Sequence, residues 1–166
     1  PFEFKPSEIT SLFKDNSFAQ ELYKGINSPN YYSIYPPVNQ WIYYMSAIPK
    51  SVFGGIIIMR LTLLAFEIAT FFVLSKIITR FSLNPNKVIW YWFNPLVILE
   101  ITGNLHAEGI LLFFLLSGLL SVTQLKDLKG GFLVALSVCS KLFSLMFLPL
   151  ILLKGGSHRW LKLMLG

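Results

Sequence analysis

The stretch from Glu100 to Glu108 concentrates side chains that could do chemistry. It holds two carboxylates, one of the two histidines, His106, and the amide of Asn104. A carboxylate beside an imidazole can transfer protons or hold a divalent ion. The same residue types also occur in ordinary polar turns between helices, and His-x-Glu is a weak metal-ligand pattern. We therefore take His106 and Glu108 as in-chain candidates for catalysis, and we predict no metal site.

Lys141 is a second candidate, because it lies within a long apolar stretch with no acidic residue nearby in sequence. Three serines at i−4, i−1 and i+3 share its helix face: Ser137, Ser140 and Ser144. A lysine beside hydroxyl groups is suited to bind an anion inside a helix bundle. The alternative is a structural ion pair between Lys141 and Glu67 or Glu100.

Arg60 and Glu67 lie within another apolar stretch, seven residues apart. Two turns of helix place them on nearly the same face. Charges in such surroundings are costly unless they are paired or face a cavity. The pattern predicts a structural ion pair, direct or through a neighbouring helix, with a role in lining a substrate path as the alternative.

The composition indicates the class of protein that must position these residues. Of 166 residues, 54% are hydrophobic and 13% charged, and mean hydropathy is +0.61, whereas soluble domains carry about 25% charged residues. The net charge of +6 comes from dispersed residues rather than the basic runs that bind nucleic acid. The single cysteine, Cys139, excludes an intrachain disulfide. We predict an integral membrane protein with no nucleic-acid partner.

Four apolar blocks predict an all-α, polytopic membrane helix bundle with about four transmembrane helices. They run approximately over residues 51–78, 88–102, 109–125 and 131–153. A crossing needs about 20 helical residues, so the middle two blocks must borrow flanking residues. Asn94-Pro95 interrupts the second block.

The first 50 residues form a different region, with six of the seven tyrosines and six of the nine prolines. Tyrosine is favoured at membrane interfaces, and residues 7–24 have the apolar spacing of a short amphipathic helix. We predict an outer-face loop with interfacial helices over 1–50, a four-helix transmembrane region over 51–153 and a truncated tail over 154–166. The opening at Pro1 and the ending at Gly166 suggest a fragment of a longer chain.

Loop charges predict the orientation of the bundle. Lysine and arginine occur in the linkers between the first two and the last two blocks, but not in residues 103–108. The positive-inside rule places those linkers in the cytoplasm, and the first 50 residues and the 103–108 turn on the outer face. The basic tail would then lie outside, against the rule.

Four segments, read together, resemble one family. They are Tyr35-Pro-Pro-Val-Asn-Gln-Trp41, Trp90-Tyr-Trp-Phe-Asn-Pro-Leu96, Gly103-Asn-Leu-His-Ala-Glu-Gly109 and Ser140-Lys-Leu-Phe143 followed by Pro149. Their order and spacing resemble the GT-C type polyprenyl-phosphate-dependent glycosyltransferases, in particular the catalytic subunit of the GPI mannosyltransferase and its bacterial relatives. The likeness covers roughly residues 1–153. The turn with His106 and Glu108 departs from the family's usual Asp spacing, and the lysine helix lacks the family's Tyr-Pro.

The resemblance implies a multi-pass membrane enzyme whose active face is periplasmic, extracytoplasmic or ER-lumenal. It would move a hexose, mannose in particular, from a polyprenyl-phosphate donor to a glycan or lipid acceptor, with no further cofactor expected. The catalytic acid is expected upstream of Pro1. Within the chain, the substrate-binding candidates are Tyr35, Glu100, Asn104 and Lys141. The alternatives are a fragment of a polytopic transporter or flippase, or a non-catalytic membrane subunit.

Overall fold

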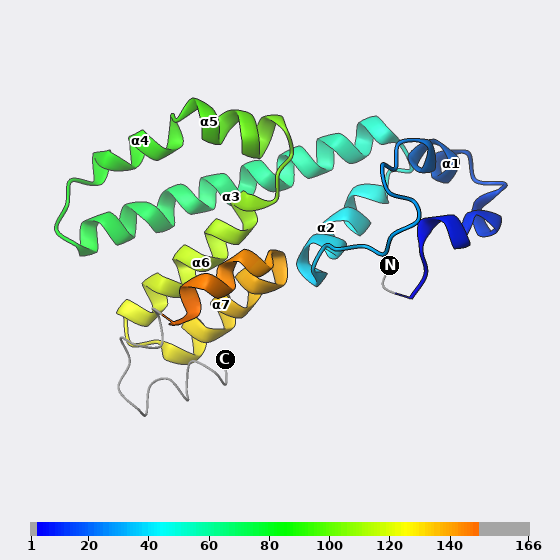
Figure 1. The fold of residues 1–166 in the computed structure, drawn as a ribbon. Helices are drawn as coiled ribbons and strands as arrows, with labels where there is room; N and C mark the ends of the chain where they lie inside the picture. The colour runs from blue at the N-terminus through cyan, green and yellow to red at the C-terminus, as the bar shows by residue number, and fades with distance from the viewer. Residues whose placement is uncertain (1–2, 150–166) are drawn as a thin grey trace.

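The computed structural model describes residues 3–149, which form helices and no strands. This confirms the all-α class for the described part of the chain. The long helix α3 runs through the molecule, α4 and α5 lie along it on one side, and the α6–α7 pair lies on another (Figure 1). The first two helices, α1 and α2, gather near the N-terminal end of α3.

Helix α3, Val52–Arg80, corresponds to the first apolar block. The hydroxyl of Ser51 begins the helix by accepting a hydrogen bond from the Gly54 N–H at 3.4 Å. Its 29 residues are apolar and long enough to cross a membrane, and only a small share of its most apolar stretch is buried within the chain. Most of its apolar surface is thus available to lipid or to further protein.

The second apolar block, which the sequence predicted to be interrupted at Asn94-Pro95, forms four short helices. These are η3 Pro85–Val88, α4 Ile89–Trp92, α5 Pro95–Val97 and the π-helix η4 Ile98–Gly103. Pro95 has no N–H with which to continue α4. The Asn94 side chain accepts a hydrogen bond from the Leu96 N–H at 2.9 Å and so begins a new helix.

The third block forms α6, Glu108–Thr123, after a sharp change of direction. The axes of Pro95–Gly103 and Glu108–Thr123 differ by 113°. Within residues 3–149, one helix is long and apolar enough to cross a membrane, or two if this bent pair counts as one crossing. The four crossings that hydropathy predicted are therefore not evident from helix length in the described residues.

The fourth block does not continue as one helix. Helix α7, Asp127–Ser140, ends immediately before Lys141, whose backbone is extended, and the 3₁₀ segment η5, Leu142–Phe147, follows. The Asn39 side chain donates to the Ser140 carbonyl at 2.8 Å and occupies an acceptor at the point where the helix ends. Lys141 is therefore at a helix break rather than in mid-helix as predicted. Residues 150–153 and the predicted tail lie outside the described residues.

The N-terminal region has less α-helix than its apolar spacing predicted. Residues 6–24 contain the 3₁₀ segments η1, Pro6–Glu8, and η2, Thr10–Phe13, before the α-helix α1, Ser17–Lys24. A second helix, α2, covers Pro37–Ala47. Lys50, with a φ of 50°, turns the chain from α2 into α3.

Two apolar clusters hold these helices together. The first contains Ile42, Leu63, Ile101 and Ile110, and joins α2, α3, η4 and α6. The second, around Leu115 and Val134, joins α6 to α7. The first cluster fixes α2 against the start of α6, and this brings the N-terminal region to the 103–108 turn.

Candidate functional site

A cavity of about 660 Å³, which has several polar side chains among its apolar ones, brings together three segments that lie far apart in the sequence. They are the loop and first turns of α2, the turn before α6, and the break after α7. The lining residues are Ile34, Tyr35, Pro36, Asn39, Tyr43, Leu105, His106, Ala107, Glu108, Ser140, Lys141, Leu142 and Phe143. Three of the four segments that carry the family resemblance thus line one cavity, which we call the polar cavity.

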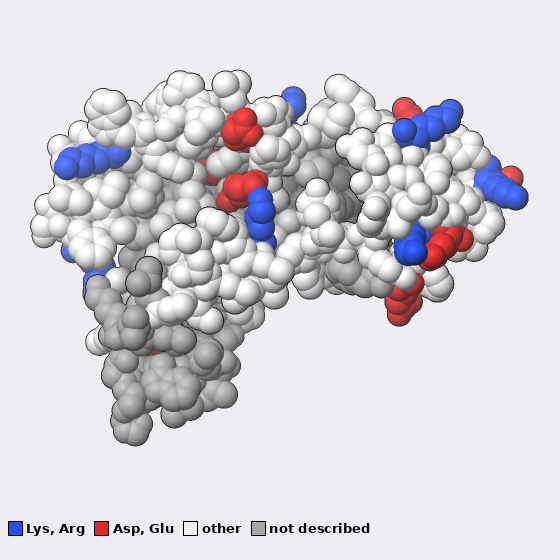
Figure 2. Space-filling view, in the orientation of Figure 1, with Lys and Arg blue, Asp and Glu red and all other residues white. Residues whose placement is uncertain are grey.

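Lys141 and Glu108 form a charged hydrogen bond within the polar cavity. The lysine therefore pairs with neither of the two predicted alternatives, Glu67 and Glu100. Both side chains of the pair are about half exposed, at 50% and 48%, so solvent and small solutes can reach them. Acidic and basic side chains meet near the centre of this face, between largely uncharged areas (Figure 2).

The protonation of Glu108 reflects this pairing. Partial burial raises the pKa of its carboxyl, but the hydrogen bond and charge of Lys141 and the nearby His106 lower it more, so the net pKa is below its usual range. Glu108 is held as a carboxylate near neutral pH. A carboxylate paired with a cation is a weaker base than one whose cation has been drawn away.

Glu100, Asn104 and His106 form a neighbouring cluster at the end of η4. His106 Nδ1 lies 2.9 Å from Glu100 Oε2, and Asn104 Nδ2 donates to Glu100 Oε1 at 3.3 Å. Leu105, with a φ of 58°, reverses the chain between this cluster and α6. His106 lines the polar cavity, whereas Glu100 and Asn104 are not among its lining residues. Glu100 instead orients the imidazole.

Tyr43 was not singled out from the sequence, yet it lies beside Tyr35 in the polar cavity. Their rings are 5.2 Å apart and nearly perpendicular, at 86°. Burial, followed by the charges of Tyr35 and Glu108, raises the pKa of Tyr43 to about 12. The Tyr43 hydroxyl is therefore a proton-bearing donor at physiological pH.

Asn39 is the second lining residue that sequence reasoning missed. Its side chain is 3% exposed, and its Nδ2 holds the Ser140 carbonyl. Its Oδ1 has no hydrogen-bond partner among the described residues. Buried acceptors usually have a donor, so this oxygen stands out among the lining groups. The resemblance had marked this segment, but sequence alone did not indicate which of its side chains faces inward.

The three serines near Lys141 have structural roles. Ser137 Oγ donates to the Leu111 carbonyl at 2.9 Å and hydrogen bonds to Ser144 Oγ, and Ser140 Oγ donates to Leu136 O at 2.8 Å. All three are fully buried. The hydroxyls of Ser137 and Ser144 join α7 to α6 and η5, whereas that of Ser140 bonds within α7. Of the three predicted serines, only Ser140 lines the polar cavity with Lys141.

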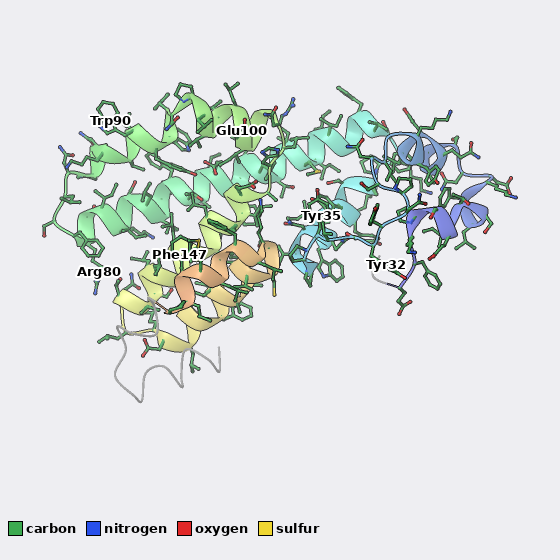
Figure 3. All side chains as sticks on the ribbon, viewed as in Figure 1. Tyr32, Tyr35, Arg80, Trp90, Glu100 and Phe147 are labelled. Atoms are coloured by element: carbon green, nitrogen blue, oxygen red, sulfur yellow. The ribbon has the colours of Figure 1, made fainter. Side chains whose placement is uncertain are left out.

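Arg60 and Glu67 do not form an ion pair within the described residues. Glu67 is 5% exposed, and the Tyr91 hydroxyl lies 3.2 and 3.3 Å from its two oxygens. Arg60 is exposed on the surface of α3. The i, i+7 spacing gave a common face, but a tyrosine from α4 reaches the carboxyl instead. Trp90, beside that tyrosine, points away from α3 (Figure 3).

The acidic and imidazole groups do not converge as metal ligands. Among residues 3–149, no group of three or more His, Cys, Asp or Glu side chains could hold a metal ion. The chemistry that the polar cavity can offer is therefore charge pairing by Lys141, proton transfer by Glu108 or His106, and hydrogen bonding by Tyr43 and Asn39.

The part of the chain that matches a known protein family contains the residues that line the polar cavity. Residues 28–154 match the family model described as alpha-(1->6)-mannopyranosyltransferase, N-terminal domain. Alpha-(1->6)-mannopyranosyltransferase A of Corynebacterium glutamicum is 24% identical over 127 residues, which is 75% of this chain and 26% of that protein. The chain thus spans about a quarter of the length of this curated relative. No solved structure matches significantly. Every residue lining the polar cavity lies within the matched range.

Proposed function

Because the chain belongs to the alpha-(1->6)-mannopyranosyltransferase family, we propose that it forms part of a membrane glycosyltransferase of the GT-C type. The proposed reaction moves mannose from a polyprenyl-phosphate donor to a hydroxyl group of a glycan or lipid acceptor. We place the reaction on the extracytoplasmic or lumenal face, where the 103–108 turn and the first 50 residues would lie. The proposed topology retains about four membrane crossings.

The single observation that carries this proposal is the polar cavity. It combines a cation, Lys141, a carboxylate, Glu108, and an aromatic pair, Tyr35 and Tyr43, on elements that the fold holds together. A phosphate needs a cation. A sugar needs hydrogen-bonding groups and aromatic surfaces. Sites of this kind combine a few convergent polar groups with apolar walls.

In the proposed mechanism, Lys141 binds the donor phosphate. The lysine already has a negatively charged partner, Glu108, in the same cavity, so an incoming phosphate would replace one anion by another. The exchange leaves the cation paired throughout, and it frees the Glu108 carboxylate. The Tyr43 hydroxyl would then bind a hydroxyl group of the sugar, and a small shift of the cavity wall would uncover the buried Oδ1 of Asn39 for another.

Glu108 or His106 would accept the proton of the attacking hydroxyl. The acceptor oxygen bonds to the anomeric carbon, the bond from that carbon to the phosphate oxygen breaks, and the phosphate leaves with the electron pair. Once Lys141 has moved to the phosphate, the pKa of Glu108 rises and the carboxylate becomes a better base. Glu100 holds the imidazole of His106 at 2.9 Å, so a proton could pass along this turn.

The test of the proposed function is donor choice by the full-length enzyme. Purified protein in detergent or liposomes is supplied with radiolabelled mannose on a polyprenyl phosphate or on a nucleoside diphosphate, together with an acceptor glycan. We expect transfer from the lipid-linked donor alone. Transfer only from the nucleotide-linked donor, or none from either with a range of acceptors, would overturn the proposal.

A further inference from the structure

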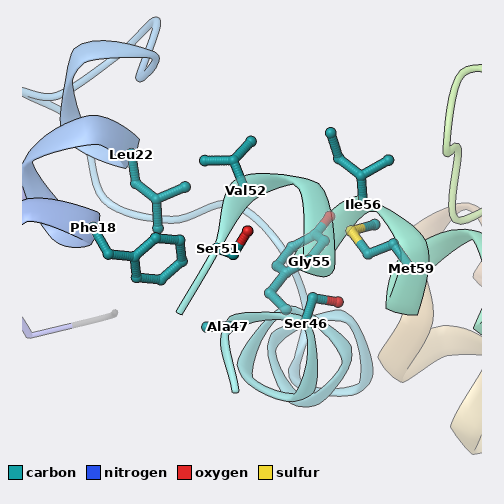
Figure 4. Close-up of a pocket in the computed structure, with 10 residues that line it drawn as sticks. Phe18, Leu22, Ser46, Ala47, Ser51, Val52, Gly55, Ile56 and Met59 are labelled. Atoms are coloured by element: carbon teal, nitrogen blue, oxygen red, sulfur yellow. The ribbon is translucent and has the colours of Figure 1, made fainter. Parts of the chain in front are cut away.

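A second pocket, of about 280 Å³, lies beside the polar cavity and is lined mainly by apolar side chains. It lies between α1, the end of α2 and the start of α3 (Figure 4). Its apolar side chains include Phe18 and Leu22 of α1, Ala47 of α2, and Ile56 and Met59 of α3. We call it the apolar pocket.

Tyr43 connects the two sites, because it lines both the polar cavity and the apolar pocket. The ring contributes to the apolar wall, while the interactions with Tyr35 and Glu108 belong to the polar side. One tyrosine thus separates a site containing a cation from a site suited to hydrocarbon. A molecule with a charged head and an apolar chain matches this sequence of surfaces.

Close backbone packing between α2 and α3 shapes one side of the apolar pocket. Gly55 of α3 packs so closely on α2 that an added Cβ would lie 2.8 Å from the Ser46 carbonyl oxygen. This contact fixes the corner between α2 and α3 that forms one side of the pocket, and α1 supplies the opposite side. The volume is close to the lower limit of about 300 Å³ for ligand pockets, so it accommodates only a short part of a long chain.

We infer that the apolar pocket binds the part of the donor's isoprenoid chain that is nearest to the phosphate. The phosphate would lie at Lys141, the chain would pass Tyr43, and Phe18 and Leu22 of α1 would enclose it. This inference rests on the proposed function and assigns the lipid subsite of the same reaction. The remaining isoprenoid chain would continue along the exposed apolar surface of α3 into the bilayer.

Two neighbouring isoleucines allow a matched test. Ile56 lines the apolar pocket, whereas Ile57 does not and is similarly exposed, at 42% against 38%. Binding of farnesyl phosphate and of inorganic phosphate is measured by calorimetry on the full-length protein. Ile56→Trp should weaken farnesyl phosphate binding about tenfold, which corresponds to excluding roughly two buried methylene groups. Ile56→Trp should leave inorganic phosphate binding unchanged, and Ile57→Trp should leave binding of both ligands unchanged.

Lys141→Met separates failure of this inference from failure of the proposed function. If Lys141→Met weakens farnesyl phosphate binding but Ile56→Trp does not, the lipid subsite is overturned and the proposed function stands. If Lys141→Met has no effect on either ligand, the phosphate role of the proposed function fails.

A photolabelling experiment on the wild-type protein does not depend on any variant folding correctly. Farnesyl phosphate with a diazirine on its first isoprene unit should label peptides containing residues 17–24 or 43–59. Labelling confined to other peptides would overturn the lipid subsite.

Discussion

Lys141 and Glu108, separated by 33 residues in sequence, form an ion pair across the polar cavity. Lys141 lies at the break after α7, and Glu108 is the first residue of α6. The pair therefore joins both ends of the α6–α7 hairpin at the place where substrate is proposed to bind. Under the proposed function, an incoming phosphate would compete with this carboxylate for the lysine, and substrate binding would then change the basicity of Glu108.

Lys141→Met in the full-length enzyme should raise the KM for the lipid-linked donor. Hydrogen bonds to charged groups contribute about 1.5–3 kcal/mol, so we expect a change of about tenfold or more. The variant should remain folded, because exposed ion pairs contribute at most about 1 kcal/mol to stability. Lys141→Arg should retain part of the activity, limited by its planar head group. An unchanged donor KM in a folded Lys141→Met protein would exclude the phosphate role.

Reversing the charges of the pair separates a structural role from a functional one. Lys141→Glu alone places two carboxylates together and should lower the melting temperature. The double variant Lys141→Glu/Glu108→Lys restores opposite charges and should recover the melting temperature, but not activity, because the cation has moved to the other wall of the cavity. Recovery of activity along with stability would indicate that only the ion pair matters.

The hydrogen bond from Tyr91 to Glu67 predicts a stability effect away from the polar cavity. Tyr91→Phe leaves the buried Glu67 carboxyl without its hydroxyl donor and should lower the free energy of unfolding by about 1–3 kcal/mol. Adding Glu67→Met removes the unsatisfied group and should restore much of the loss. A double-mutant cycle measured by thermal unfolding checks this, and additive effects of the two changes would contradict the direct contact.

Hydropathy and proline positions predicted the helices whose boundaries depend on nearby residues. The apolar stretch from residue 51 predicted α3, and the Asn94-Pro95 pair predicted the interruption of the second block. The apolar surroundings of Lys141 and the family resemblance of the Tyr35 segment selected these two site residues, and the fold places both at the polar cavity. Their roles in binding substrate are still predictions.

Contacts between distant elements could not be predicted from the sequence. Apolar periodicity carried α7 through Lys141, but a side chain from α2, Asn39, takes the Ser140 carbonyl where the helix ends. Helical spacing placed Ser137 on the same face as Lys141. It could not predict that Ser137 packs against α6. The partner of Lys141 was unpredictable for the same reason, because it depends on how α6 and α7 pack.

Close packing of α6 on α7 depends on Gly118. A Cβ at this position would lie 2.7 Å from Val134 Cγ2 and 3.1 Å from the Gly130 carbonyl oxygen. Gly118→Ala should therefore destabilise the protein by about 1–3 kcal/mol, seen as a lower melting temperature. Gly25→Ala is the matched control, since its Cβ would meet only Leu22 O, at 3.5 Å. Equal effects of the two substitutions would contradict the close contact.

The proposed topology is tested by cysteine labelling at the two ends of α6. Asn104 precedes this helix, Lys126 follows it, and both are exposed. In a Cys139→Ala background of the full-length protein, Asn104→Cys should react with a membrane-impermeant maleimide added outside, whereas Lys126→Cys should react only after permeabilisation. Labelling of both cysteines from the same side would show that α6 does not cross the membrane.

Asn39 is expected to recognise one hydroxyl of the transferred sugar. Its Nδ2 already donates to the Ser140 carbonyl, whereas its buried Oδ1 has no partner among the described residues. Asn39→Ala should therefore raise the KM for the natural donor about tenfold. Deoxymannosyl donors, each lacking one hydroxyl, identify the hydroxyl that Asn39 binds. The wild-type enzyme should use one of these analogues about tenfold less well than the natural donor. The Asn39→Ala enzyme should use that analogue and the natural donor equally well. A lower melting temperature with unchanged discrimination among the deoxy donors would show that Asn39 only holds α2 against the end of α7.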